Sequence, residues 1–180
     1  MMLSNDCSVA EARRLRELAA WYRAYAERAG NPAIWDARLR TAEDLEAEAI
    51  GIERLGRDAV SDRIHELLHR NLQEVFGEGD ATRRHAAIAE LYTEDCVLYV
   101  PPGTFVGHEA LDKFAGDLRA THPHFAYTTH GEPQALHNAG RLAWGSGPRG
   151  EAPKYTGMDV IIVRDGKIAA LYVFLDSIPS

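Results

Sequence analysis

The sequence has few cysteines, no long apolar run and no block of basic residues. Two cysteines among 180 residues, Cys7 and Cys96, cannot by themselves form a disulfide framework or a multi-thiolate zinc site. No apolar stretch approaches the roughly 18 residues of a transmembrane helix, and the N-terminal segment lacks the apolar core of a secretory signal. The formal net charge of −7 argues against a phosphate-binding surface. We therefore expect a cytoplasmic protein with neither a nucleic-acid nor a membrane partner.

Residues 1–56 also contain few residues that interrupt helices. They hold one of the eight prolines and three of the fifteen glycines. Apolar residues recur at three- and four-residue steps along 7–29 and again along 33–55, as on one face of a helix. Gly30-Asn31-Pro32 between them supplies a helix stop, an N-cap and a first-turn proline. The segment is predicted to form an antiparallel helical hairpin, which would bury its apolar stripes against each other, the rest of the chain or a second subunit.

Residues 57–180 have a different pattern, so we place a boundary at 56/57. Helices are expected over about 58–76, from Asp80 to about Tyr92, and over 108–119. The expected strands are 96–100, 124–130, 134–137, 141–147, 155–163 and 167–176, with a hairpin turn at Asp165-Gly166. Helices followed by a run of antiparallel strands predict an α+β fold.

Three motifs carry a family resemblance. They are Glu90-Leu91-Tyr92-Thr93-Glu94-Asp95-Cys96, Pro102-Gly103-x-x-x-Gly107 and the run from Asp159 to Ile168. With the order of elements, they make about residues 57–178 resemble the SnoaL-like branch of the nuclear-transport-factor-two-like superfamily. That superfamily includes ketosteroid isomerase, scytalone dehydratase, limonene epoxide hydrolase and polyketide cyclases. The resemblance implies a cone-shaped, curved antiparallel sheet with three helices packed on its concave face, and chemistry without a cofactor.

The resemblance also assigns roles to particular positions. In relatives of ketosteroid isomerase, a general base ends the first strand, and this position is Val100, which cannot take a proton. The tyrosine donor of the first helix corresponds to Leu72. The carboxyl group that opens the penultimate strand corresponds to Asp159, which would then be a protonated acid that donates to an oxyanion.

The strand pattern independently draws attention to Asp159. Alternation places it on the same face as Ile161 and Val163, so its carboxyl group is expected to be desolvated and its pKa raised unless it is paired. Alternatively, Asp159 is exposed at the rim of the sheet. The candidate proton donors or acceptors beside it are Tyr92, Tyr155, His124 and His130.

Apolar residues are expected to line a cavity next to Asp159. By the resemblance these are Val100, Phe114, Trp144, Tyr155, Leu171 and Val173, with Leu175 nearby. Such a lining suits a small hydrophobic organic ligand, whereas the alternative is that these side chains simply fill the core. On the opposite face, Tyr172, Phe174, Val160 and Ile162 form a second apolar surface, which is predicted to be a homodimer interface or a docking site for the hairpin.

His65-Glu66-Leu67-Leu68-His69 matches the H-E-x-x-H pattern of zinc proteases. The extended form of that motif requires Gly and His at the positions of Leu72 and Val75. We therefore interpret His65 and His69 as histidines at the edge of the core and expect no metal.

Two hypotheses about function follow. The first is a cofactor-free isomerase, cyclase or dehydratase that moves protons on a small apolar molecule through Asp159. The second is a non-catalytic ligand-binding or dimerisation module, which the apolar residue at Val100 supports. An H-E-x-x-H zinc hydrolase is a distant third.

Overall fold

The computed structural model describes residues 3–176, and the side chains from Ser8 onward. The chain divides into two compact units, residues 1–59 and 60–180. Helix α2 (Pro32–Arg70) runs through this boundary without a break, where the sequence suggested two helices separated near Gly56. A single glycine costs a helix only about 1 kcal/mol, so the residues on either side of Gly56 can maintain it. No helix of the described residues is long and apolar enough to cross a membrane.

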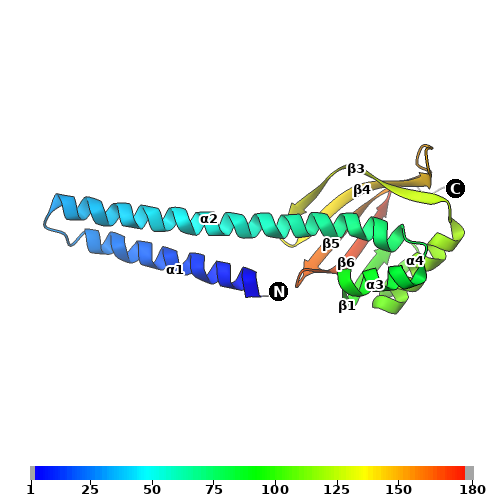
Figure 1. Cartoon of the computed structure of the whole chain (residues 1–180), viewed down its shortest axis with the longest axis horizontal. Coiled ribbons are helices and arrows are strands. Elements are labelled where there is room, and N and C mark those ends of the chain that lie inside the picture. The colour runs from blue at the N-terminus through cyan, green and yellow to red at the C-terminus, as the bar shows by residue number, and fades with distance from the viewer. Residues whose placement is uncertain (1–2, 177–180) are drawn as a thin grey trace. The chain divides into compact units, whose positions relative to one another are not determined.

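The first unit is the expected helical hairpin. Helix α1 (Leu3–Ala26) lies antiparallel to the first part of α2 (Figure 1). Asn31 caps α2, because its Oδ1 accepts a hydrogen bond from the backbone N–H of Ala33 at 2.9 Å. The two helices meet through small residues such as Ala12 and Ala49, both fully buried, and Arg16 forms two hydrogen bonds with Glu53 at 2.5 and 2.9 Å.

The second unit contains a six-stranded sheet in the order β2-β1-β6-β5-β4-β3. The strands are β1 (Tyr92–Val100), β2 (Gly103–Val106), β3 (Phe125–Leu136), β4 (Ala139–Pro148), β5 (Tyr155–Arg164) and β6 (Lys167–Leu175). All neighbours are antiparallel except β1 and β6, which pair in parallel, so the expectation of a wholly antiparallel sheet was wrong. The last described strand lies beside the first one, and the one helix (α4) and four strands between them provide the long connection that a parallel pair requires.

Several strand bounds differ from the prediction, and β1 already begins at Tyr92 rather than at Cys96. Pro101 and Pro102 form the turn between β1 and β2, with Val100 paired to Gly103, whereas they were expected only to end a strand. Strand β3 is continuous where two strands were expected, and its pairing with β4 shifts between His130 and Gln134. Gly131 has φ 81°, a conformation that favours glycine, so the extra residues are accommodated there without ending the strand.

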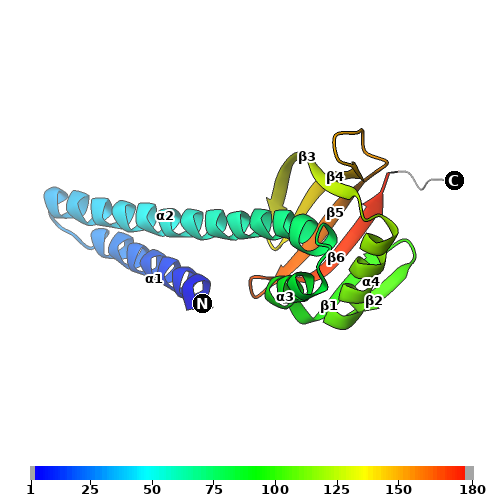
Figure 2. The ribbon, with the colours of Figure 1, turned by 45° about the vertical axis from the view of Figure 1, so that its right-hand side comes forward.

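Helices cover one face of this sheet. The π-helical segment η1 (Asn71–Phe76) continues α2 and contacts β3, while α3 (Ala81–Leu91) contacts β1 and β6 and α4 (His108–Thr121) contacts β1 and β2 (Figure 2). Asp80 accepts a hydrogen bond from Arg83 N at 2.9 Å and caps α3, as its position predicted. The architecture confirms the α+β fold class.

The opposite face of the sheet carries exposed aromatic residues. Leu98 and Leu171 point into the core, so their neighbours Tyr99 and Tyr172 lie on the other face. The rings of these two tyrosines stack with centroids 4.5 Å apart, and Phe174 is 59% exposed. We call Tyr99, Tyr172 and Phe174 the outer aromatic patch.

Candidate functional site

Asp159 lies within β5 with its carboxyl group buried and only 3% of the residue exposed. Trp144 Nε1 on β4 donates a hydrogen bond to Oδ1 at 2.8 Å, and Asn71 Nδ2 on η1 donates one to Oδ2 at 3.0 Å. Burial raises the pKa of Asp159 to about 7, although the two hydrogen bonds favour its charged form. The group is therefore able to change its protonation state near neutral pH.

A buried tyrosine holds the Asn71 amide in this orientation. The Tyr92 hydroxyl donates to Oδ1 of Asn71, which leaves Nδ2 to face Asp159. Burial and the nearby charge of Asp159 raise the pKa of Tyr92 well above its ordinary value, so the phenol remains protonated. Tyr92, Asn71 and Asp159 thus form one continuous chain of hydrogen bonds.

Gly157 provides the space through which the Trp144 indole reaches Asp159. Gly157 on β5 is paired with Trp144 on β4. A Cβ atom at Gly157 would lie 2.8 Å from Trp144 Cζ2 and 2.4 Å from the carbonyl oxygen of Phe174. A larger side chain would therefore displace the indole, and with it the donor to Asp159.

Asp159 faces a cavity of about 250 Å³. Its walls come from η1, the β1–β2 turn, α4 and strands β3 to β6, and most of the side chains are apolar. The lining residues are Leu72, Phe76, Val100, Pro101, Pro102, Phe114, Leu118, Arg119, His122, Phe125, Tyr127, Trp144, Ser146, Tyr155, Asp159, Val173 and Leu175. An apolar space with one buried carboxyl group can hold a small hydrophobic molecule against a group that exchanges protons.

A family model described as a SnoaL-like domain matches residues 69–171, more than half of the chain and all of the strands except the end of β6. The chain belongs to the SnoaL-like family. None of the proteins of curated function matches the sequence.

Solved structures of similar fold come from several bacteria. A SnoaL-like family protein of Agrobacterium tumefaciens C58, proposed to be an isomerase, is 20% identical over 64% of this chain and 99% of its own, with a TM-score of 0.60. A proposed SnoaL-like polyketide cyclase of Jannaschia sp. CCS1 is 12% identical over 65% of this chain and 88% of its own, with a TM-score of 0.54. A proposed ketosteroid isomerase of Kribbella flavida is 15% identical over 67% of this chain and 82% of its own, with a TM-score of 0.51. At these identities the likenesses show the fold of this SnoaL-like protein.

Most of the residues expected beside Asp159 do line the cavity. They are Val100, Phe114, Trp144, Tyr155 and Val173. Leu171 does not: it is fully buried in the core, where it pairs with Ile161 in the middle of the β5–β6 register. Val100 and Leu72 both contribute to the wall, so the two positions that hold a base and a tyrosine in relatives of ketosteroid isomerase are apolar here.

His124 and His130 do not lie in the cavity. Both are exposed, His124 in the turn before β3 and His130 on the strand itself. Thr129 pairs with Trp144, and the next residue, His130, points to the other face of the sheet, where its Nε2 lies against Gly145. The histidine of the wall is His122, whose Nε2 is 3.4 Å from the Tyr155 hydroxyl.

Asn71 and Tyr127 are among the polar residues of the site that were not predicted from the sequence. Asn71 follows Leu67 by four residues and Leu68 by three, so it lies on the apolar stripe of the helix, and a polar residue in such a stripe is the signal that would have identified it. Tyr127 of β3 is hydrogen-bonded by the Ser146 side chain, and burial raises its pKa to about 12. Alternation along β3 alone does not distinguish it from its neighbours.

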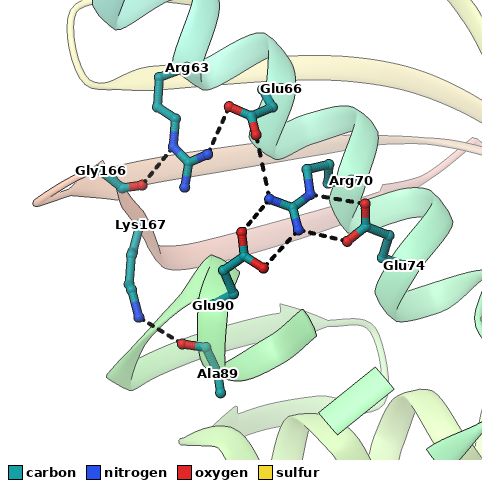
Figure 3. Close-up of polar contacts among 8 residues, drawn as sticks. All are labelled: Arg63, Glu66, Arg70, Glu74, Ala89, Glu90, Gly166 and Lys167. Atoms are coloured by element: carbon teal, nitrogen blue, oxygen red, sulfur yellow. Dashed lines mark hydrogen bonds and ion pairs between the residues drawn. The ribbon is translucent and has the colours of Figure 1, made fainter. Parts of the chain in front are cut away.

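Glu66 of the H-E-x-x-H motif belongs to an ion-pair network on the helix surface (Figure 3). Glu66 accepts hydrogen bonds from Arg63 at 2.8 Å and from Arg70 at 3.4 Å, and these cations lower its pKa. Arg70 also binds Glu74 and Glu90. Within residues 8–176, no three histidine, cysteine or carboxylate side chains come together as a metal site. Glu66 therefore has electrostatic partners on its own helix, and its contacts suggest a structural role.

Proposed function

We propose that this SnoaL-like protein transfers protons on a small, largely apolar organic molecule, as an isomerase, cyclase or dehydratase. The observation that carries the proposal is the buried Asp159 carboxyl group, with a pKa of about 7, at the wall of an apolar cavity. A general acid–base group works best when its pKa is close to the working pH.

The hydrogen bonds around Asp159 favour a role as the base. The Trp144 indole can only donate, and Asn71 presents its amide N–H because its oxygen is bound by Tyr92. Both carboxylate oxygens therefore accept hydrogen bonds, which is the arrangement that stabilises the ionised form. This differs from the protonated, donating acid that the family resemblance implies for the same position.

The proposed reaction uses one carboxyl group for both proton transfers. Asp159 removes a proton from a carbon next to a carbonyl group, and the electron pair of that C–H bond moves onto the carbonyl oxygen. The same proton is returned to another carbon in an isomerisation, or to a hydroxyl group that departs as water in a dehydration. In a cyclisation the enolate carbon attacks a second carbonyl carbon, and the oxygen of that carbonyl group takes the proton back from Asp159. Val100 and Leu72 offer no second base or donor, so the phenolic donors of the cavity are Tyr127 and Tyr155.

Solvent exchange tests the proposal without knowledge of the natural substrate. Small ketones such as 1-indanone and 2-tetralone, incubated with the protein in D₂O, are expected to exchange their acidic C–H protons faster than in acetate buffer of equal carboxylate concentration, as followed by ¹H NMR. If ketones that bind in the cavity show no acceleration at any pH between 6 and 9, the protein is a binding module.

We further propose that two copies pair through the outer aromatic patch. Exposed, stacked aromatic rings on a sheet face are a costly surface in water, and a second identical face would cover them. Tyr172→Glu is expected to convert a dimer into a monomer in size-exclusion chromatography with light scattering. Leu136→Glu is the control, since Leu136 is 72% exposed on β3 at the far edge of the sheet. A monomeric wild-type protein, or a Tyr172→Glu variant that remains dimeric, would contradict the pairing.

A further inference from the structure

Arg119 brings a positive charge to the wall of the apolar cavity. Its Nη1 donates to the carbonyl oxygen of Phe125 at 2.6 Å and its Nη2 to that of Pro123 at 3.1 Å. Its Nε is buried and has no hydrogen-bond partner among the described residues, and none of their carboxylates pairs with it. An arginine is always charged and carries five N–H donors, so this one retains both charge and donor capacity.

His122 lies beside this arginine, and Tyr155 lies beside the His122 ring. The carbonyl oxygen of His122 is 3.5 Å from Arg119 Nη1, and the His122 ring lies 3.4 Å from the Tyr155 hydroxyl. All three residues line the cavity. We call Arg119, His122 and Tyr155 the arginine cluster. The charge of Arg119 also acts on Tyr127, whose pKa it lowers against the larger effect of burial.

The arginine cluster and Asp159 are at different ends of the cavity wall. Tyr155 and Asp159 lie on the same face of β5, four residues apart, which corresponds to about 13 Å along the strand. Gly157 lies between them on this face and has no side chain. The wall between the two polar ends is therefore formed by apolar groups, among them the Trp144 indole packed over Gly157.

We propose that the arginine cluster binds an anionic oxygen group, of the carboxylate class, at the end of the apolar molecule on which Asp159 acts. A carboxylate would accept a hydrogen bond from the Tyr155 hydroxyl and would be attracted by the positive charge of the Arg119 guanidinium, which no carboxylate of the described residues pairs with. Hydrogen bonds between two charged groups are about twice as strong as neutral ones, and they gain further in an apolar surrounding. The substrate class is thus a small apolar acid with its carboxylate remote from the reacting carbon. This inference rests on the proposed function only for the role of Asp159.

A matched pair of probes tests the anion site on the full chain. The binding of 2-naphthoate and of its neutral isostere naphthalene-2-carboxamide can be measured by isothermal titration calorimetry at pH 6. We expect 2-naphthoate to bind at least about tenfold more tightly than the carboxamide, and Arg119→Gln to abolish this preference. Equal affinities of the two probes for the wild-type protein would overturn the proposal.

Arg119 also donates hydrogen bonds to the backbone of residues 122–125, so Arg119→Gln could weaken binding by disturbing that segment. A second variant separates this structural effect from the loss of the anion site. Tyr155→Phe leaves every Arg119 hydrogen bond in place, and it is expected to weaken 2-naphthoate about three- to tenfold while changing the carboxamide less than twofold. If Arg119→Gln and Tyr155→Phe each weaken both probes equally, the cluster has only a structural role. Asp159→Asn should keep the preference for naphthoate, so a failure of the anion site is distinguishable from a failure of the proton-transfer function.

Discussion

Asp159→Asn is expected to slow the deuterium exchange of bound ketones by roughly 10²- to 10⁴-fold, the range that a positioned acid–base group contributes. The amide has the size of the carboxyl group but cannot take up a proton. It can still accept hydrogen bonds through its oxygen, so ligand affinity should change by only a few fold. The measurement is the exchange rate at saturating ketone, together with a dissociation constant for the same ketone.

Asp165→Asn is the matched control for this variant. Asp165 is exposed in the β5–β6 turn with φ 55°, a conformation that asparagine also tolerates, so the substitution should leave exchange unchanged. In the wild-type protein the exchange rate should fall as the pH decreases through about 7, because the base becomes protonated. An Asp159→Asn variant with the wild-type rate would exclude Asp159 as the base and leave the cavity as a binding site.

Alternation along a strand indicated that Asp159 shares an apolar face with Ile161 and Val163, but it left open whether the carboxyl group is buried or exposed at the rim of the sheet. The partners of Asp159 were harder to predict, since they come from other elements. The Tyr92 hydroxyl reaches Asp159 only through Asn71. Asn71 and Asp159 are 88 residues apart in the sequence. No local pattern encodes a contact of that range.

The same limit explains the errors in the fold. The parallel pairing of β1 with β6 depends on how the whole sheet closes, whereas strand signals report only on a few neighbouring residues. His130 was a candidate proton donor or acceptor, and it lies on the same strand as the cavity residue Tyr127. The three-residue separation, an odd number, places the two side chains on opposite faces, and only the register with β4 shows which face is the inner one.

Trp144→Phe is expected to raise the pKa of Asp159 by about one to two units. The substitution retains most of the aromatic ring but removes the Nε1–H that donates to Oδ1. A hydrogen bond to a charged group contributes about 1.5–3 kcal/mol, and each pKa unit corresponds to about 1.4 kcal/mol. The pKa can be read directly from the ¹³C resonance of the Asp159 carboxyl carbon during a pH titration.

The pH dependence of stability gives an independent reading, because the pKa of Asp159 is about 7 in the folded protein and its ordinary value is 3.8. Between these values the folded state holds a proton that the unfolded state has lost, so the unfolding free energy should fall as the pH rises, by roughly 4 kcal/mol in total. In Trp144→Phe the fall should continue to about pH 8–9. Lost packing around the smaller ring would lower the unfolding free energy at every pH without changing the pH at which its fall ends. Trp35→Phe, at an exposed tryptophan of the hairpin, is the control and should change neither the unfolding free energy nor that pH. An unchanged upper end in Trp144→Phe would show that the indole N–H does not stabilise the carboxylate, and the assignment of Asp159 as a base would lose its main structural support.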